Sequence, residues 1–291
     1  MTLRRLLGDD VATFIRDSYQ RLPVSRTGGA SQLCELGTWE ILASALQSPK
    51  AEAEVVRRNR RYEGPLPTTA TEAQQLVAEG YTLLVKHVER HDGRLAELAQ
   101  GFRDDLAAPV NIHLYCTPPE QYGFAWHYDA EDVFIVQTTG SKEYSLRKNT
   151  VNPWPLEETL PADMRYEREI MPLMKCLLTA GDWLYLPSGY WHMGSVKASA
   201  AGAGEPAISL AIGIMPRTGV DLFDHARSLV LDSLLWRQRL PVVGAASDLT
   251  EEQLHSALAQ LAEQLGDDFR RAITSPAFLQ KLVQQLRSPS G

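Results

Sequence analysis

The stretch Trp126-His127-Tyr128-Asp129 decides how this sequence is interpreted. Side chains two residues apart along a β-strand point to the same face, so His127 and Asp129 would present an imidazole and a carboxylate to one point. His192 follows an apolar run, Trp183–Leu186, and a short turn, which places it on another strand of the same barrel. These three side chains are therefore the candidate ligands of one metal ion.

Two imidazoles and one carboxylate on one face are the ligand set of non-haem Fe(II) sites, and they leave coordination positions open for other ligands. A structural zinc site is disfavoured because none of the three cysteines, Cys34, Cys116 and Cys176, belongs to the set. Spacing alone leaves two alternatives open, a metal site and a group of structural residues.

Lys142 begins a β-rich run after the turn Thr138–Ser141. Tyr144 and Leu146 share its face, and that face is the apolar one, so the sequence predicts that Lys142 points inward. An inward lysine needs an anionic partner because an unpaired buried charge is costly. A bound carboxylate would serve, although a lysine at a strand end can also extend to water.

Short β-rich runs alternate with Gly, Pro and Asn turns between residues 111 and 216, which is typical of an antiparallel sandwich or barrel. The expected strands are Asn111–Cys116, Asp132–Gln137, Glu143–Leu146, Cys176–Leu178, Trp183–Leu186 and Ile208–Met215. In the first strand one face is polar, with Asn111, His113 and Tyr115. In the last strand one face is small, with Ser209, Ala211 and Gly213. Such faces line a binding site or lie open to solvent.

Helical patterns flank this β-rich region on both sides. The expected helices are Asp9–Tyr19, Thr38–Leu46, Thr71–Glu79, Arg94–Leu106, one that carries Leu222 to Leu235, Thr250–Leu265 with Asp248 as its cap, and Ser275–Leu286. A strand is expected at Tyr81–His87, and an exposed loop at Ala198–Pro206. The leucine-rich C-terminal helices form either a dimer interface or an appendage packed on the β core.

The chain has 291 residues and a net charge of −7, from 29 Lys and Arg against 36 Asp and Glu. This balance argues against direct nucleic-acid binding, which normally needs a basic excess. The chain has no run of the ~20 apolar residues that span a bilayer, so we expect a cytoplasmic protein without a membrane segment. The basic cluster Arg57–Arg61 either steers an acidic partner or is a solvated surface.

Five segments resemble the JmjC-type cupin oxygenases, and within them the ribosomal oxygenases. The similar segments are Tyr115–Pro119, Gly123–Asp129, Asp132–Gln137, Gly140–Lys142 and Gly181–His192. The resemblance implies a mainly β fold with flanking helices, in which a double-stranded β-helix (cupin or jelly-roll) core over about 111–216 lies within an oxygenase domain, 1–216. Residues 217–291 would then be a helical C-terminal region and a candidate dimerisation segment.

The resemblance also implies the chemistry. His127, Asp129 and His192 would hold Fe(II), and Lys142 would pair with the distal carboxylate of 2-oxoglutarate. Tyr115 matches a position that lines the cosubstrate pocket, and Ser209 is a further pocket candidate. His113 stands where relatives often carry asparagine, which leaves its role open. The reaction implied is hydroxylation of an unactivated C–H bond with O₂, coupled to decarboxylation of 2-oxoglutarate to succinate.

The substrate stays open at this point. We expect a protein side chain of ribosomal-protein type, to which the acidic net charge is suited. The alternatives are a small molecule or peptide metabolite as substrate, a histone demethylase, and a cupin binding protein without catalysis. Two departures bear on this choice. About 75 residues follow Pro216, too few for the helical and winged-helix-like modules that ribosomal oxygenases usually carry, and Trp126 replaces a frequent proline.

Overall fold

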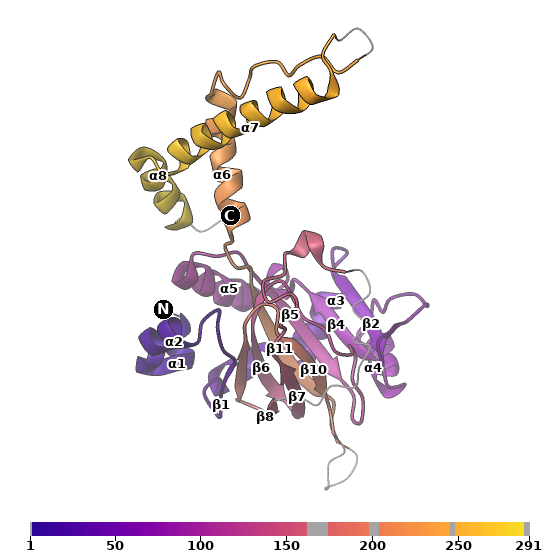
Figure 1. Ribbon diagram of the computed structural model, residues 1–291. Coiled ribbons are helices and arrows are strands. Elements are labelled where there is room, and N and C mark those ends of the chain that lie inside the picture. Colours follow the sequence, from indigo (N-terminus) through magenta and orange to yellow (C-terminus); the bar gives the residue numbers. More distant parts are fainter. Residues whose placement is uncertain (1, 162–173, 198–203, 245–247, 288–291) are drawn as a thin grey trace. The chain divides into compact units, whose positions relative to one another are not determined.

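The computed structural model describes residues 2–161, 174–197, 204–244 and 248–287 (Figure 1). The chain divides after Pro216 into two compact units. The first unit holds all the described strands, and the second is helical. Most of the loop expected at Ala198–Pro206 lies outside the described residues.

An eight-stranded sheet forms the larger part of the first unit, and every neighbouring pair of its strands is antiparallel. In spatial order its strands are β1 (Val24–Arg26), β9 (Trp183–Leu186), β6 (Asp132–Thr139), β11 (Ala207–Ile214), β5 (Val110–Thr117), β4 (Thr82–Lys86), β2 (Glu52–Arg57) and β3 (Arg60–Arg61). The central position of β11 follows from its apolar, β-branched sequence.

A second sheet contains β10 (Trp191–Ser195), β7 (Ser141–Arg147) and β8 (Met174–Thr179), also antiparallel. An isolated bridge between His127 and His192 extends this sheet beyond β10. A separate hydrophobic cluster joins the two sheets, with Val133 and Leu184 from one and Tyr144 and Leu178 from the other. The two facing sheets confirm the expected double-stranded β-helix core.

Alternation along the central strands gives the large sheet two different faces. On β11 the outer face carries isoleucine and leucine, and the inner face carries Ser209, Ala211 and Gly213. The register places these three opposite Tyr115, His113 and Asn111 of β5, respectively. The polar and small faces seen in the sequence therefore lie side by side, turned toward the second sheet.

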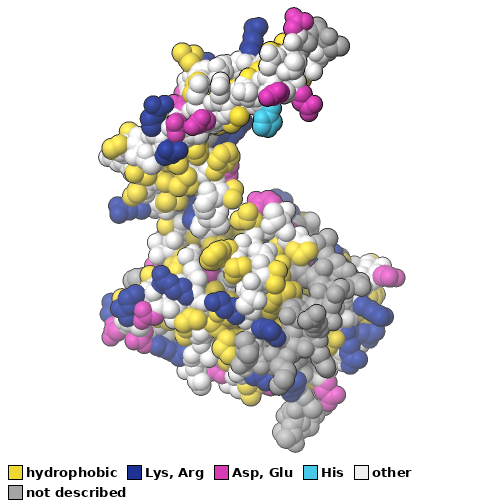
Figure 2. Space-filling view, viewed as in Figure 1, with side chains coloured by type: hydrophobic (Ala, Val, Ile, Leu, Met, Phe, Trp, Pro, Cys, Tyr) yellow, Lys and Arg dark blue, Asp and Glu magenta, His cyan; other side chains and the backbone are white. Residues whose placement is uncertain are grey.

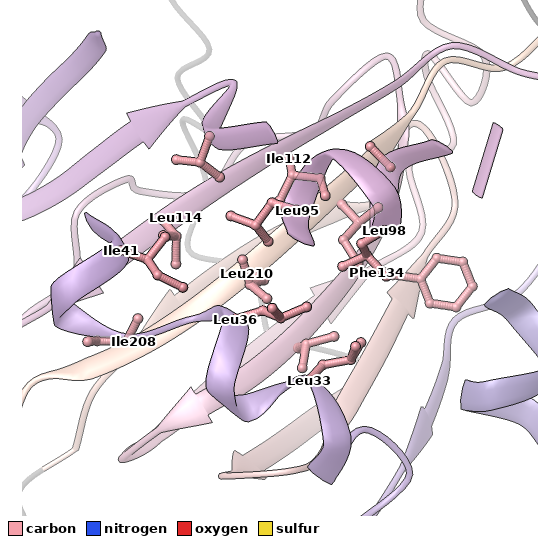
Figure 3. Packing of buried hydrophobic residues seen from close by; sticks show 14 of the residues in the cluster. Leu33, Leu36, Ile41, Leu95, Leu98, Ile112, Leu114, Phe134, Ile208 and Leu210 are labelled. Carbon is pink, nitrogen blue, oxygen red and sulfur yellow. The ribbon is translucent and has the colours of Figure 1, made fainter. Parts of the chain in front are cut away.

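Helices cover the outer face of the large sheet, where the main core lies (Figures 1 and 3). They are α1 (Thr2–Leu7), α2 (Val11–Asp17), α3 (Trp39–Leu46), α4 (Ala70–Ala78) and α5 (Gly93–Leu106), with short 3₁₀ turns η1 (Gly8–Asp10), η2 (Ser31–Leu36), η3 (Val88–Arg90) and η4 (Glu157–Thr159). Thr38 and Asp92 cap α3 and α5, and Thr69 caps α4 in a capping box with Glu72. Figure 3 shows Leu95 and Leu98 of α5 beside Ile112 of the sheet.

Three strands were not expected from the sequence, β1, β2 and β3, and the bounds of β10, the strand expected to carry His192, were not predicted. They are short, and charged or small residues interrupt their apolar pattern, so pairing across the sheet decides their structure. The basic cluster forms a tight hairpin between β2 and β3, with Arg58 and Asn59 in the left-handed region. The Arg57 guanidinium lies 4.5 Å from the centre of the Tyr81 ring.

The second unit consists of α6 (Gly219–Asp232), α7 (Glu251–Ile273) and α8 (Pro276–Arg287). The helix expected to reach Leu235 ends at Asp232, and α7 continues past the expected end at Leu265. The cap of α7 is Thr250, not Asp248, because Thr250 forms a capping box with Gln253. None of the described helices has the length and hydropathy needed to cross a bilayer.

Phe134 is the ring around which the main core is organised. It is fully buried, and its ring centre lies 4.9 Å from that of Tyr185 and 5.4 Å from that of Phe102. We predict that Phe134→Ala lowers the free energy of unfolding by about 3–5 kcal/mol in urea titrations, because it opens a cavity between sheet and helices. Phe134→Leu, the control, should cost clearly less. A loss below about 1 kcal/mol for the alanine variant would contradict this account of the core.

Candidate metal centre and adjoining pocket

His127 and His192 face each other across the bridge that extends the second sheet. The amide of each residue donates to the carbonyl of the other, at 3.1 Å from His127 and 2.8 Å from His192. This exchange makes His127 and His192 a hydrogen-bonded antiparallel pair, in which the two side chains lie directly opposite each other. Their ring centres lie 4.2 Å apart. Backbone pairing therefore brings two residues 65 positions apart to one point.

The Nδ1 atoms of both histidines contact backbone carbonyls. His127 Nδ1 lies 2.8 Å from the carbonyl oxygen of Ala125, and His192 Nδ1 lies 3.0 Å from that of Tyr190. A carbonyl only accepts hydrogen bonds, so each Nδ1 carries the proton and each Nε2 has a free lone pair. This is the arrangement by which proteins orient an imidazole that binds a metal ion.

Asp129 completes the group. Its Oδ2 lies 3.5 Å from His192 Nε2, and one donor atom from each of the three residues lies within 4.8 Å of the others. The Asp129 carbonyl accepts hydrogen bonds from the Gly189 amide, at 2.9 Å, and the Ser188 hydroxyl, at 3.4 Å. The turn that precedes β10 is thus tied to the residue whose side chain meets His192.

Electrostatics favour a neutral His192. Burial lowers the pKa of this imidazole, and the neighbouring His127 lowers it further. A neutral imidazole is the form that binds a metal ion. Two nitrogen donors with fixed tautomers and one carboxylate oxygen fit a divalent transition metal, Fe(II) among them, and leave coordination positions for other ligands.

Beside this group a pocket opens between the two sheets, and every residue singled out in the sequence for a site lies on it. Its walls include His113, Tyr115, Lys142 and Ser209 together with the three candidate ligands, His127, Asp129 and His192. Phe124 and Tyr144 add aromatic walls, and Gly194 and Ala211 add small ones. The alternation of side chains along each strand predicted that these residues share inner faces, but it did not show that the inner faces of different strands meet in one pocket.

Lys142 is buried in this pocket. Its Nζ donates to the Thr117 hydroxyl at 3.3 Å, and lies 5.4 Å and 5.5 Å from the ring centres of Tyr115 and Tyr144. A Cβ at Gly194 would clash with the Lys142 side chain, so the glycine leaves room for it. Burial lowers the pKa of Lys142 to about 8. Within the described residues no carboxylate forms an ion pair with it.

The hydroxyl-bearing residues around Lys142 are neutral hydrogen-bonding groups. Burial raises the pKa of both Tyr115 and Tyr144. Ser209, buried on β11, shares a side-chain hydrogen bond with Tyr144. This end of the pocket therefore combines one cation with several hydroxyl groups, a combination that suits a carboxylate.

His113 lines the pocket from β5, between Asn111 and Tyr115 on the inner face of that strand. Its Nδ1 accepts a hydrogen bond from the His87 amide at 3.1 Å. Burial and the nearby His87 lower the pKa of His113 to about 4, so the ring is neutral at pH 7 and carries its proton on Nε2. His113 is therefore a hydrogen-bond donor on this wall.

One residue of the pocket, Glu131, was not singled out as a site residue from the sequence, and neither was its hydrogen-bond partner Asn111. Asn111 Nδ2 donates to Glu131 Oε2 at 2.9 Å. Burial and the nearby Asp129 raise the pKa of Glu131 to about 7. The alternation that pairs His127 with Asp129 extends to Glu131, so the signal was present, but the contact with Asn111 depends on the register of separate strands.

Comparison with known proteins agrees with this geometry. Residues 84–220 match the JmjC domain family. The histidyl-hydroxylase and lysine-specific demethylase NO66 of Drosophila sechellia is 30% identical over 115 residues, 40% of this chain and 18% of that protein. Its counterpart from Dictyostelium discoideum is 32% identical over 118 residues, 39% of this chain and 22% of that protein. The matched region thus covers about a fifth of these relatives.

Solved structures resemble the whole chain more broadly. The Escherichia coli ribosomal oxygenase YcfD in complex with cobalt and 2-oxoglutarate aligns with a TM-score of 0.63 at 19% identity, over 97% of this chain and 71% of that one. The complex of YcfD with cobalt and succinic acid aligns with a TM-score of 0.60 at 20% identity, over 91% of this chain and 70% of that one. At this identity the likeness shows a shared fold.

Lys142 gives a test that separates a binding role from a structural one. Folding takes its pKa from 10.5 to about 8, so the folded state disfavours the charged form by about 3 kcal/mol at pH 7. We predict that Lys142→Met raises the free energy of unfolding of the ligand-free protein, by up to about 3 kcal/mol below pH 8, because it removes this penalty.

The gain should shrink as the pH rises from 8 to 10.5, where the wild-type amine loses its proton in the folded protein. Urea titrations at pH 7 and pH 10 measure it, and Lys175→Met, an exposed lysine on β8, is the control. A variant that is less stable than wild type at both pH values would mean that Lys142 contributes to folding through its contacts with Thr117 and the tyrosines.

Proposed function

We propose that this protein is an Fe(II)- and 2-oxoglutarate-dependent oxygenase that hydroxylates an unactivated C–H bond of a protein side chain, because residues 84–220 match the JmjC domain family. One observation carries the proposal: three metal donors with free lone pairs converge beside a buried lysine that has no carboxylate partner within the described residues. If His192 and Asp129 formed only a structural ion pair, the oriented ring of His127 and the unpaired ammonium group of Lys142 would have no purpose.

The residues fit the ferrous ion as its ligands. His127 and His192 would bind it through Nε2, since both Nδ1 atoms contact carbonyls, and Asp129 would bind through a carboxylate oxygen. When bound, the ion supplies the redox chemistry by which O₂ oxidises a C–H bond while 2-oxoglutarate becomes succinate and CO₂. The protein contributes position: the bridge between the two histidines fixes both rings before any ligand arrives.

Lys142 would hold the carboxylate of 2-oxoglutarate that lies away from the ion. The Thr117 hydroxyl already accepts one hydrogen bond from the ammonium group, and Tyr115 and Tyr144 flank it at cation–π distance. A carboxylate that enters this end gains a charge-assisted hydrogen bond in a site with little water. The aromatic rings of Phe124 and Tyr115 meet edge to face and line the same space.

A protein substrate is supported by the matches to NO66, which is named as acting on histidine and lysine side chains, and to YcfD, which is named as a ribosomal oxygenase. Both are proteins that this chain resembles in part. Gly123 and Phe124, in the loop 121–125, line the pocket, and a side chain presented by a partner's surface would enter it.

We predict that the purified protein converts 2-oxoglutarate to succinate only when supplied with Fe(II) and O₂, as measured by NMR. His192→Ala should reduce turnover to background, because two ligands remain where three are needed. His255→Ala, on α7 in the helical unit, is the matched control and should retain wild-type turnover. Succinate production by His192→Ala equal to that of wild type would refute the proposed site.

The substrate class is tested by mass spectrometry of a cell extract incubated with wild type or with His192→Ala. We expect products heavier by one oxygen atom on a protein side chain, present with wild type alone. The same mass increase on a metabolite, with proteins unchanged, would retain the oxygenase and replace the protein substrate by a small molecule. If neither proteins nor metabolites gain an oxygen atom, the protein is a cupin that binds its ligand without catalysis.

We also propose that the helical unit forms a homodimer. The helix α7 has no fully buried residue, although Phe269 and Ile273 pack partly against α6 and α8, and exposed apolar side chains remain on its neighbours, among them Leu231 of α6 and Leu279 of α8. Figure 2 shows hydrophobic side chains among the surface atoms of these helices. Exposed apolar patches of this kind mark association sites, and a second copy of the chain carries the complementary surface.

Light scattering after size-exclusion chromatography should therefore give twice the chain mass of 32.4 kDa. Leu231→Glu together with Leu279→Glu should shift the protein to monomer, because charges would be buried at the interface. The control Arg227→Glu, also on α6, changes the surface charge without removing apolar area. A wild-type protein that is monomeric at micromolar concentration would contradict the dimer.

A further inference from the structure

A buried carboxyl group that the proposed chemistry does not use begins β6. Asp132 is fully buried, and no lysine or arginine in the described part of the chain forms an ion pair with it. Its Oδ1 accepts two hydrogen bonds, whereas its Oδ2 is buried with no hydrogen-bond partner among the residues that the structure describes. Burial raises the pKa of this carboxyl group to about 6. Burying a carboxyl group in this way costs free energy, so the arrangement calls for an explanation.

Both hydrogen bonds to Asp132 come from the segment that leads from β9 into β10. The Tyr185 hydroxyl, on β9, and the Ser188 amide, in the turn that follows, each donate to Asp132 Oδ1 at 3.0 Å. One carboxylate oxygen can accept two such bonds, and its charge makes each of them stronger than a bond between neutral groups. Asp132 therefore fixes the position of the turn 187–190 relative to the start of β6.

The same turn contacts two of the three candidate ligands. The Gly189 amide donates to the carbonyl of Asp129 at 2.9 Å. The Tyr190 carbonyl lies 3.0 Å from His192 Nδ1 and accepts its proton in a hydrogen bond, which orients the ring. The turn therefore positions one ligand through its backbone and the other through its imidazole.

The segment after α2 contacts this network from its other side. The Gln20 amide donates to the Tyr185 hydroxyl at 2.7 Å, and the Tyr190 hydroxyl donates to the Arg21 carbonyl at 3.3 Å. Gln20 has a φ of 59°, in the left-handed region that is uncommon for residues other than glycine. Because the Tyr185 oxygen accepts from Gln20, its own proton is free to be donated to Asp132.

We propose that Asp132 is a positioning residue for the metal centre, which holds the turn 187–190 so that Asp129 and His192 meet at one metal ion. The role rests on the proposed function, because it takes these two residues as metal ligands. Asp132 itself touches neither ligand side chain. The contacts run from Tyr185 to Asp132, from Asp132 to the turn, and from the turn to both ligands, so loss of Asp132 Oδ1 would leave the ligands free to separate.

Cobalt binding measures this role without turnover. The purified full-length protein is freed of metal by chelation and titrated with Co(II), and the visible absorption of the bound ion gives the dissociation constant. We expect Asp132→Ala to bind Co(II) at least about 10-fold more weakly than wild type, as is typical when a group that orients metal ligands is removed. Asp132→Asn should bind within about threefold of wild type, because its Oδ1 still accepts both hydrogen bonds.

Tyr185→Phe tests the order of the contacts. It removes one of the two donors to Asp132, and we expect it to weaken Co(II) binding about 3-fold in the wild-type background but less than about 1.5-fold in Asp132→Ala, because a residue that acts through another loses its effect once the other is removed. The single variant also keeps the test informative if Asp132→Ala does not fold. Wild-type affinity in Tyr185→Phe, or equal effects in the two backgrounds, would contradict the proposed role.

Asp182→Ala is the matched control. Asp182 is also buried, and its carboxylate also accepts hydrogen bonds from backbone amides, those of Gly28 and Thr179 at 2.8 Å. It precedes β9, however, whereas the turn 187–190 follows β9. We therefore expect Asp182→Ala to bind Co(II) within about twofold of wild type, since its hydrogen bonds do not reach the ligands. Urea titrations establish that both alanine variants are folded under the conditions of the metal titration.

Wild-type affinity in Asp132→Ala, or an equal loss in Asp182→Ala, would overturn the role of Asp132. His192→Ala and succinate formation by the iron-loaded wild type are measured in parallel. Co(II) binding that His192→Ala does not weaken would refute the metal centre, and with it both proposals. Co(II) binding that depends on His192 without succinate formation would refute the oxygenase alone.

Discussion

The site depends on one backbone interaction, the pair of hydrogen bonds between His127 and His192. These bonds set the register between β10 and the segment before β6, and a shift of either segment by one residue would turn its histidine ring to the other face of the sheet. Each ring is then held by a contact to the carbonyl two residues before it. The same local geometry occurs twice, so two side chains far apart in sequence reach one point with the same tautomer.

Stability and chemistry are divided between the two faces of the large sheet. The outer face packs Phe134, Leu210 and their neighbours against the helices and is dry. The inner face borders the pocket, which is lined by Lys142 of the second sheet together with Glu131 and His113, and burial disfavours the charged forms of all three. The core on one side therefore offsets the cost of the polar groups on the other, as is common where a protein keeps a strained or unpaired group for binding.

Alternation within single strands was enough to predict much of the site. It placed Asp129 with His127 and turned Lys142 inward with Tyr144, and the structure brings these side chains to one pocket. The contact of Glu131 with Asn111 was out of reach, because it depends on the pairing of β11 with β5 and β6, which no local pattern encodes. His192 was expected on a strand, but the bounds of that strand were not predicted, since Gly194 and Ser195 interrupt its apolar pattern.

The glycines on the inner face show how the fold turns a sheet into a pocket. Gly213 and Gly194 lie on different sheets, and a side chain at either would occupy the space of a charged group, Glu131 in one case and Lys142 in the other. Loss of a side chain on a strand normally weakens it. Here the missing side chain leaves room for an ionisable group, the carboxyl group of Glu131 over β11 and the amine of Lys142 beside β10. The polar character of the pocket therefore depends on the glycines of β10 and β11 as well as on the ionisable residues for which they leave room.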